Sequence, residues 1–383
     1  MCAQVRIRHS CAIEKLRVIN DSLTHEQRKM IEKTPFHVLL DIPNTEINGY
    51  LLSALIEGWD EGVNGFWIKG KLVRFTLHDV ACILGLRVGG TAVRVFDEYG
   101  SSQLHDLLRA SFPGQPLTRA LVQNLIKKCE GIASLEDFCR VYIAFAFTTF
   151  LFPLPSRGIH GNFFSLLDNL DDLGEYGWGK AVYDFLVDGI CHAVKTRKRE
   201  KNSSEIRIKG CAPLLQLWAL EHTLMVKPGT SKCLWPRIRN WTSKTLTNND
   251  AHAMIYSIEG DKEVVNVLAP SKQELKEVII IESMHDADYL SLCTPVSSNH
   301  ANVKALPDSK FKYEEKCVEY QKLLQEHDQL RNEHESLKGT LVLCRVMYEK
   351  KCGEYDQLLQ AYEGLMKGKH TGGTRKRKKK RII

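Results

Sequence analysis

Cysteine and histidine are the side chains of this sequence best suited to nucleophilic chemistry. Among its 12 cysteines and 14 histidines, Cys191 and His192 are adjacent, and Cys211 precedes His222 by eleven residues. A cysteine hydrolase needs a thiol and an imidazole in contact, with an acid or amide orienting the imidazole. Adjacent residues on a helix point about 100° apart, and residues eleven apart can share a face without touching. A cryptic hydrolase is therefore only the second alternative to a binding function.

Metal and phosphate motifs are missing from the sequence. It contains no Cys-x-x-Cys or His-x-x-x-His pair of the kind that holds zinc, and no Gly-x-x-x-x-Gly-Lys-Ser/Thr phosphate loop. Asp171, Asp172 and Glu175 have the residue types of a transposase metal site, but they fall in a short helix–loop stretch that we expect to be solvated. We predict no catalytic residue, no metal ligand and no cofactor, and we predict that the chain is not an enzyme.

The composition is that of a protein with a full-sized core. The chain has 383 residues, and 43% of them are hydrophobic. Its first residues lack the apolar block of a signal peptide, so we expect reduced thiols in the cytosol or nucleus. The longest apolar stretch, residues 141–154, is too short to span a bilayer and predicts a buried helix. We therefore expect no membrane partner.

The body of the chain is predicted to be mostly helical. Thr24 and Gln27 form a capping box that opens a helix. Thr76, with Asp79 three residues later, caps a second helix that Gly85 ends. Further helices are expected over residues 46–57, 101–110, 118–129, 134–152, 163–170, 179–194 and 213–224.

A few strands are expected beside these helices. Residues 66–68 and 72–75 flank Lys69-Gly70-Lys71 and predict a hairpin. Residues 254–258 and 264–268 also look like short strands. Ser271 and Glu274 open one more predicted helix, and residues 286–309 are a predicted linker.

Three blocks of the body, taken in order, resemble a known family. The first runs over residues 51–60, 66–68 and 75–90, the second over residues 150–153, 166–170 and 174–179, and the third over residues 210–222. Together they cover about residues 20–285 and resemble the plant mobile domain, often labelled aminotransferase-like. This domain occurs in transposons and in genes derived from them.

The resemblance implies a transposon-derived origin and a role near chromatin or gene silencing. It does not imply transamination, because the sequence shows no Schiff-base lysine with a phosphate cup of the kind that pyridoxal phosphate needs. Some relatives join the domain to a cysteine protease for ubiquitin-like modifiers, where this chain has a long heptad segment. Most block residues are expected to pack in the core. The polar exceptions are Asp79, Asp168, Glu175, Glu221 and His222.

Residues 313–365 carry the heptad pattern. One set of positions repeats every seven residues from Tyr313, and the other from Lys316. The alternating steps of four and three residues predict a left-handed coiled coil. Residues 313–320 recur as residues 348–355, an offset of five heptads that keeps the seam in phase. The predicted seam residues are Tyr320, Leu323, Leu330, Leu337, Leu341, Tyr348, Tyr355, Leu358 and Leu365.

The sequence does not identify the partner of this predicted coiled coil. Tyr and His fill seam positions where tight two-stranded coils prefer Ile or Val, so the number and orientation of the chains are not fixed. The alternative is a single helix packed on the chain's own body. We expect association with a second copy or with another coiled-coil protein.

The chain ends in a basic tail. Its charged residues are Arg375, Lys376, Arg377, Lys378, Lys379, Lys380 and Arg381. They carry as much positive charge as the net charge of the whole chain, +7, so the body is neutral and is not an electrostatic DNA clamp. The tail resembles a nuclear localisation signal and predicts a nuclear import receptor as partner. The first alternative is a nucleic-acid-binding protein that uses this tail and a solvated loop at Lys195–Lys201.

The predicted fold class is mainly α. We expect a helical globular domain with a small β-hairpin and short strands, followed by a C-terminal coiled coil. The predicted segments are an N-terminal segment (1–20), a plant-mobile-domain-like helical domain (21–285), a linker (286–309), the coiled coil (310–366) and the basic tail (367–383). The predicted function is that of a non-enzymatic, transposon-derived interaction protein of the nucleus that associates through its coiled coil.

Overall fold

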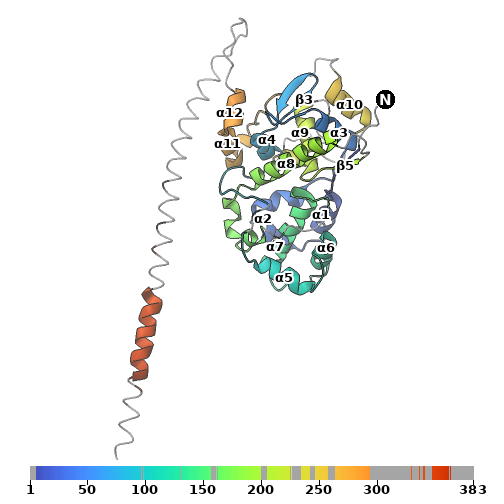
Figure 1. Ribbon diagram of the computed structural model, residues 1–383. Helices are drawn as coiled ribbons and strands as arrows, with labels where there is room; N and C mark the ends of the chain where they lie inside the picture. Colours follow the sequence, from blue (N-terminus) through green and yellow to red (C-terminus); the bar gives the residue numbers. More distant parts are fainter. Residues whose placement is uncertain are drawn as a thin grey trace, which may run out of the picture. The chain divides into compact units, whose positions relative to one another are not determined.

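A computed structural model gives the structure of the chain (Figure 1). It describes residues 6–95, 97, 99–129, 131–156, 161, 163–199, 205–224, 226, 234–241, 246–257, 264–293, 329, 336, 340, 347–361 and 363. The chain divides into two units, Met1–Val296 and Ser297–Ile383. Helices dominate the described part of both units, which confirms the mainly α prediction.

The first unit consists of short helices with a few strands between them. Its α-helices are α1 (Ile13–Asn20), α2 (His25–Glu32), α3 (Gly49–Glu57), α4 (Leu77–Leu84), α5 (Gln103–Ser111), α6 (Arg119–Lys128), α7 (Leu135–Ala146), α8 (Trp178–Arg199), α9 (Ala212–Thr223), α10 (Asn248–Tyr256), α11 (Val278–Met284) and α12 (Ala287–Cys293). Its strands are β1 (Arg6–Arg8), β2 (Trp59–Asp60), β3 (Gly65–Ile68), β4 (Lys71–Arg74) and β5 (Glu205–Arg207). Short 3-10 segments cover Pro35–Asp41, Phe164–Leu167, Asp171–Glu175, Arg237–Asn240 and Glu274–Lys276, and a π-helical turn covers Phe147–Leu151.

Local side-chain chemistry sets where α2 and α4 begin. The Thr24 hydroxyl accepts the N–H of Gln27, and the Gln27 side chain accepts the N–H of Thr24. Thr76 and Asp79 make the same reciprocal bonds at the start of α4. Gly85 then ends α4 with φ at 68°, the left-handed region that favours glycine. All three local predictions are confirmed.

The predicted hairpin is also confirmed. β3 and β4 pair antiparallel, with Phe66 opposite Val73, and β2 adds a third strand by pairing Trp59 with Phe66. Side chains alternate between the two faces of a strand. Phe66 and Ile68 are therefore buried, whereas Trp67 between them is 49% exposed.

A second sheet joins segments that lie far apart in the sequence. β1 pairs in parallel with β5, with Ile7 opposite Ile206, and both isoleucines are buried. The predicted N-terminal segment 1–20 thus contributes β1 and α1 to the first unit.

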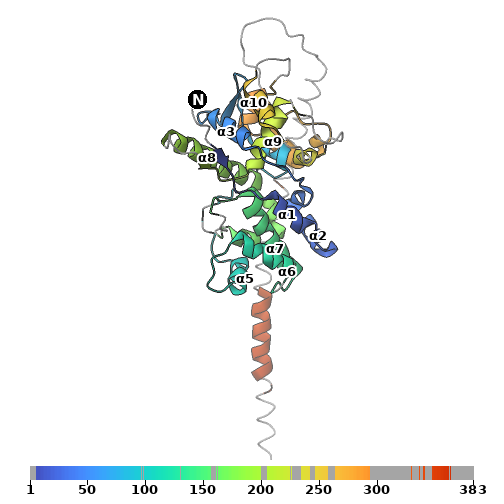
Figure 2. The same ribbon diagram turned by 90° about the vertical axis from the view of Figure 1, so that its right-hand side faces the viewer.

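The core runs through the whole first unit. Figures 1 and 2 place α1, α2, α5, α6 and α7 in one half of this unit, and α3, α8, α9 and α10 in the other. α4 contacts α8, α9 and α11. α9 is buried on all sides, and Leu214, Leu217 and Trp218 have no exposed surface. Among the described helices, none combines the length and the apolar character needed to cross a bilayer.

Several local expectations are wrong. Residues 254–256 belong to helix α10, which a capping box of Thr247 and Asp250 opens. Residues 264–268 form irregular backbone, in which Val265 N–H donates to the carbonyl of His222. The start of the predicted linker is helix α12, whose Tyr289 is buried.

The ends of other expected helices differ as well. The expected helix 134–152 is α7 followed by the π-helical turn, and the expected helix 163–170 is only a 3-10 turn. The basic segment at Lys195–Lys201 is not a loop in its described part, because α8 continues through Arg199. Cations at a helix C-terminus interact favourably with the helix dipole, which explains the longer helix.

The second unit is helical wherever it is described, and every side chain of residues 347–361 is exposed. Tyr348, Tyr355 and Leu358 of the predicted seam lie on this helix. The other seam residues, Tyr320, Leu323, Leu330, Leu337, Leu341 and Leu365, lie outside the described residues, as does the whole basic tail. The coiled coil therefore stays a prediction.

Candidate functional site

Two of the polar candidates meet between α4 and α9. His222 Nε2 lies 3.3 Å from Asp79 Oδ1, and Trp218 Nε1–H donates to Asp79 Oδ2 over 3.2 Å. The rings of Trp218 and His222 are 4.6 Å apart between centroids. All three side chains are buried. The fold thus brings together Asp79 and His222, which come from separate sequence blocks.

Each ring nitrogen of His222 faces an oxygen atom that can accept a hydrogen bond. Nδ1 faces the carbonyl oxygen of Val265, which can only accept a hydrogen bond, and Nε2 faces the Asp79 carboxylate. The imidazole of His222 and the carboxylate of Asp79 are thus in hydrogen-bond contact inside the fold. Burial alone raises the pKa of Asp79, but the charge and hydrogen bond of His222 and the N–H of Thr76 outweigh it and lower that pKa. The carboxylate is charged, yet its hydrogen bonds are made inside the fold.

Glu221 belongs to a neighbouring ionic cluster. Arg237 pairs with Glu221 over 3.0 Å and with Glu274 over 2.7 Å, and Trp241 Nε1–H donates to Glu221 over 2.7 Å. Burial alone lowers the pKa of Arg237, but the hydrogen bond and charge of Glu274 and the charge of Glu221 raise it overall. One partly buried cation, Arg237 of the Arg237–Asn240 segment, therefore connects this segment to α9 and to the Glu274–Lys276 segment. The sequence indicated Glu274 only as the partner of Ser271 in a helix cap, and it gave no sign of Arg237, because no short spacing connects either residue to α9.

The remaining acidic candidates have structural contacts. The Asp168 carboxylate accepts the N–H groups of Gln103 and Leu104 over 3.0 and 3.3 Å, so it caps the N-terminus of α5. Glu175 is exposed at the end of the 3-10 segment Asp171–Glu175. Within the described ranges, no group of three His, Cys, Asp or Glu side chains could hold a metal ion.

α4 carries a thiol–imidazole pair that sequence reasoning missed. Cys82 Sγ lies 3.3 Å from His78 Nε2, and both residues are fully buried. The same Nε2 lies 3.0 Å from the carbonyl oxygen of Leu268, so it carries a hydrogen and cannot accept the thiol proton. Burial raises the pKa of Cys82 and lowers that of His78. An activated thiol needs the opposite shift. The spacing of four residues on a predicted helix was the signal that could have found this pair.

The Cys–His pairs considered from the sequence do not form dyads. Cys211 precedes the first turn of α9 and His222 lies in its last turn, so they are roughly 16 Å apart along the helix axis. Burial raises the pKa of Cys211 and of Cys191. Neither thiol is activated by an adjacent imidazole.

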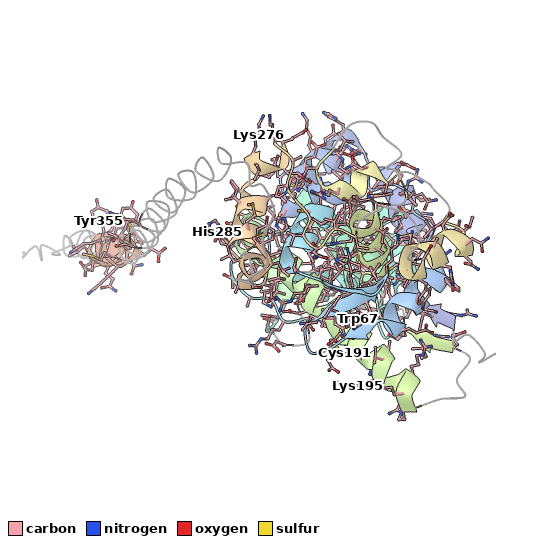
Figure 3. The ribbon with its side chains drawn as sticks, turned by 90° about the horizontal axis from the view of Figure 1, so that it is seen from above. Trp67, Cys191, Lys195, Lys276, His285 and Tyr355 are labelled. Carbon is pink, nitrogen blue, oxygen red and sulfur yellow. The ribbon has the colours of Figure 1, made fainter. Side chains whose placement is uncertain are left out.

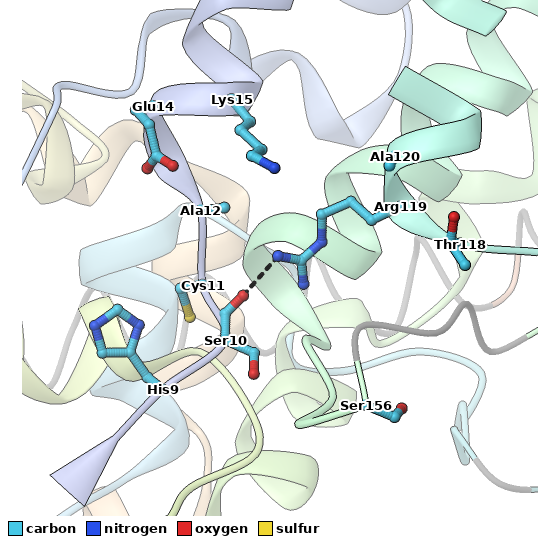
Figure 4. A pocket seen from close by; sticks show the side chains of 10 residues that line it. All are labelled: His9, Ser10, Cys11, Ala12, Glu14, Lys15, Thr118, Arg119, Ala120 and Ser156. Carbon is cyan, nitrogen blue, oxygen red and sulfur yellow. Dashed lines mark hydrogen bonds between the residues drawn. The ribbon is translucent and has the colours of Figure 1, made fainter. Parts of the chain in front are cut away.

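A cavity of about 430 Å³ opens beside Cys11 (Figure 4). Arg119 lines it and donates to the carbonyl oxygen of Ser10 over 2.8 Å and to that of Thr148. Burial raises the pKa of Cys11 to about 12, so the thiol stays protonated at neutral pH. Although His9 also lines the cavity, the thiol is not a prepared nucleophile. Arg119 instead fastens the segment before α1 to the end of α7.

A family model matches a large part of the first unit. Residues 9–216, more than half of the chain, match the family model described as Domain of unknown function (DUF8566). The match includes the hairpin, α4 with its buried polar groups, and the first turn of α9. The chain therefore belongs to this family of domains, and the part of it that matches is mainly helical.

Comparison with curated proteins gives named relatives of the chain. The chain is 27% identical over 234 residues to Protein MAINTENANCE OF MERISTEMS of Arabidopsis thaliana, a match that covers 58% of this chain and 47% of that protein. It is 26% identical over 236 residues to Protein MAIN-LIKE 1 of the same plant, covering 58% and 45%. The chain belongs to the plant mobile domain family, as its sequence blocks predicted.

The chain spans about half the length of these two curated relatives. A third, the Serine/threonine-protein phosphatase 7 long form homolog of Arabidopsis thaliana, is 29% identical over 194 residues, which is 48% of this chain and 14% of that protein. No solved structure matches the chain.

Proposed function

We propose that this chain is a non-enzymatic, transposon-derived interaction protein of the nucleus that self-associates through its C-terminal helix. The observation that carries the proposal is the exposure of Tyr348, Tyr355 and Leu358, which are 71%, 68% and 69% exposed. They are spaced seven and three residues apart on the helix over residues 347–361, so they lie on one face. An exposed apolar stripe on a helix favours binding to another helix.

The exposed helix has little to stabilise it alone. Helices of about 12–15 residues are marginal in water. The ion pair of Lys351 with Glu354 has side chains that are 78% and 47% exposed, so it contributes little. Burial against a partner would contribute about 1.5–3 kcal/mol for a side chain such as Leu358. A second copy is the favoured partner. Residues 313–320 recur at 348–355 with the heptad in phase, so two copies can align similar seam residues.

The first unit supports the non-enzymatic part of the proposal. Asp79, His222 and Glu221 make their strong contacts inside the fold. Burial raises the pKa of each thiol near a histidine, including Cys82. The word phosphatase in the name of one relative describes that protein, and the match covers only 14% of it.

Self-association can be tested on the seam. Replacing Tyr355 and Leu358 together by Glu places charge on the apolar stripe, so light scattering should show a monomer where the parent chain shows an oligomer. The matched control is Gln357→Glu with Gln360→Glu, which adds the same charge at positions off the predicted seam. A parent chain that is monomeric, or a seam variant with the mass of the parent, would contradict the proposal.

Nuclear import can be tested on the tail. Replacing the Lys and Arg residues of 375–381 by Ala should spread a fluorescent fusion into the cytoplasm, because an import signal of this type is read by its positive charge. Replacing Lys195, Lys198 and Arg199 by Ala should leave the fusion in the nucleus. Nuclear retention of the tail variant would defeat this part of the proposal.

A further inference from the structure

The hairpin presents an exposed tryptophan that self-association does not use. Trp67 is 49% exposed, whereas the five other tryptophans of the chain are buried or partly buried. The N–H of Trp67 donates to the carbonyl oxygen of Gly58 over 2.8 Å. Trp67 therefore lies beside the C-terminal end of α3, next to Glu57.

The Glu57 carboxylate, at the C-terminal end of α3, contacts the side chains of an arginine and a tyrosine. Arg197 of α8 pairs with Glu57, and Tyr256 O–H donates to Glu57 over 3.0 Å. Arg197, Lys198 and Glu57 line a cavity of about 570 Å³. Figures 2 and 3 show the end of α8 projecting from the first unit, and Figure 3 labels Trp67 and Lys195 on the same side of it. The cations at the end of α8 therefore lie beside the end of α3, to which the backbone of Trp67 is hydrogen-bonded.

Tyr256 belongs to a row of aromatic rings. Its ring centroid is 5.1 Å from that of His252, which is 6.3 Å from that of Tyr50. His252 is exposed, and Tyr256 is 43% exposed. The N–H of Lys69, in the hairpin turn, donates to the carbonyl oxygen of Ile255 over 2.7 Å. α10, which carries this row, thus packs directly on the hairpin that carries Trp67.

Exposed rings beside cations suit one class of ligand. The bases of single-stranded nucleic acid stack on aromatic side chains, and its phosphates pair with Lys and Arg. Duplex DNA hides the base faces, and the acidic side chains of a peptide carry no aromatic rings that could stack. Glu57 does not neutralise all the positive charge at this end of α8, since Arg197 is only partly buried and the neighbouring Lys198 is exposed.

We propose that the aromatic–cationic face formed by Trp67, His252, Tyr256, Arg197 and Lys198 binds single-stranded nucleic acid. Bases stack on Trp67 and Tyr256, and Arg197 and Lys198 hold the phosphates. This face differs from the tail and loop expected from the sequence, because its cations lie on a helix and its affinity depends on exposed rings.

The experiment removes the contribution of the tail first. A full-length variant with Ala at the basic positions of 375–381 serves as parent, and fluorescence anisotropy follows its binding to short labelled oligouridine, oligothymidine and a DNA duplex. The parent should bind the single strands more tightly than the duplex. Trp67→Ala should weaken single-strand binding about tenfold through lost stacking. Trp67→Phe, which keeps a ring, should restore most of the affinity.

Charge and control variants complete the design. Lys198→Glu should weaken single-strand binding about fivefold and make it less dependent on salt. Lys180→Glu, near the other end of α8, and Val18→Ala, at an exposed apolar position of α1, should bind like the parent. Trp67 is the most exposed tryptophan, so unlabelled oligonucleotide should also change the intrinsic tryptophan emission of the parent but not that of Trp67→Ala.

Three results would overturn the proposal. They are a parent that binds neither single strand, a duplex that binds as tightly as the single strands, and a folded Trp67→Ala variant with the affinity of the parent. Circular dichroism confirms folding of each variant. Binding of either oligouridine or oligothymidine with the expected loss in Trp67→Ala supports the proposal and identifies the preferred sugar.

Discussion

Helix α9 and the helix over residues 347–361 differ completely in what surrounds them. In α9 even the polar Gln216 is buried, with its amide bonded to the backbone of Asn48 and Glu46 over 2.7 and 2.8 Å. In residues 347–361 every side chain is exposed. Helices in proteins gain most of their stability from packing of their apolar face. α9 finds that packing inside the first unit, whereas the helix over residues 347–361 has no buried side chain among its described residues.

The comparison also separates two uses of polar side chains. The polar groups around α9 are ion pairs and hydrogen bonds that fix α4, α9 and the Arg237–Asn240 segment together. Their substitution should change stability. The exposed residues of the C-terminal helix and of the aromatic–cationic face should instead change association and binding, with little effect on folding.

The largest effect is expected in the buried helix. Trp218→Ala should lower the free energy of unfolding by about 3–5 kcal/mol, because it leaves a cavity in a fully buried site. Urea denaturation followed by circular dichroism measures the loss. Trp67→Ala removes the same side chain from a half-exposed site and should cost much less. Equal losses of unfolding free energy in Trp218→Ala and Trp67→Ala would contradict the contrast between buried and exposed residues.

Asp79→Asn should come next, at about 3 kcal/mol near neutral pH, because it leaves the buried His222 without its charged partner. The pKa of Asp79 is lowered in the folded state, so this stability is present above the unfolded pKa of about 4. It is lost as pH falls through the lower folded pKa. The difference in unfolding free energy between parent and Asp79→Asn should therefore shrink in acid below about pH 4.

A matched control for this pH dependence is Asp184→Asn. Asp184 pairs with Lys180 over 2.9 Å, and both side chains are about half exposed, so its loss should cost under about 1 kcal/mol. Urea titrations at several pH values compare the two variants. A constant difference between parent and Asp79→Asn across acid pH would show that the buried pair is not charged.

The smallest effect is expected from the ion pair on the exposed helix. Lys351→Ala should change stability by no more than about 0.5 kcal/mol and should leave the oligomer mass unchanged, since its pair with Glu354 is solvated. Thermal melting and light scattering measure both quantities. A large loss would mean that polar contacts, and not the apolar stripe, hold the helix to its partner.

The parts of the fold that sequence reasoning predicted are local. The caps at Thr24 and Thr76 rest on bonds between residues three positions apart, and the β3–β4 hairpin on a two-residue turn. Such short-range chemistry can be recognised in the sequence. The strand predicted over residues 254–258 is wrong in its described part, because the Thr247–Asp250 capping box just before it starts a helix that continues through Tyr256.

The sequence indicated which residues belong to the polar centre between α4 and α9, but it did not indicate that they are in contact. Asp79 and His222 were candidates by residue type, but their contact spans 143 positions and depends on how α4 packs on α9. The ion pairs of Arg237 with Glu221 and Glu274 were missed because only tertiary packing brings these residues together. The exposure of Trp67 beside the end of α8 likewise depends on packing that no local pattern encodes.

The pairing of β1 with β5 sets an order of events during synthesis. Ile7 leaves the ribosome roughly 200 residues before its partner Ile206, an interval of about 10–40 s at ordinary elongation rates. During that interval the leading strand has an open edge and an uncovered isoleucine. Molecular chaperones that shield nascent apolar segments therefore have a defined window, which closes when Glu205–Arg207 emerges.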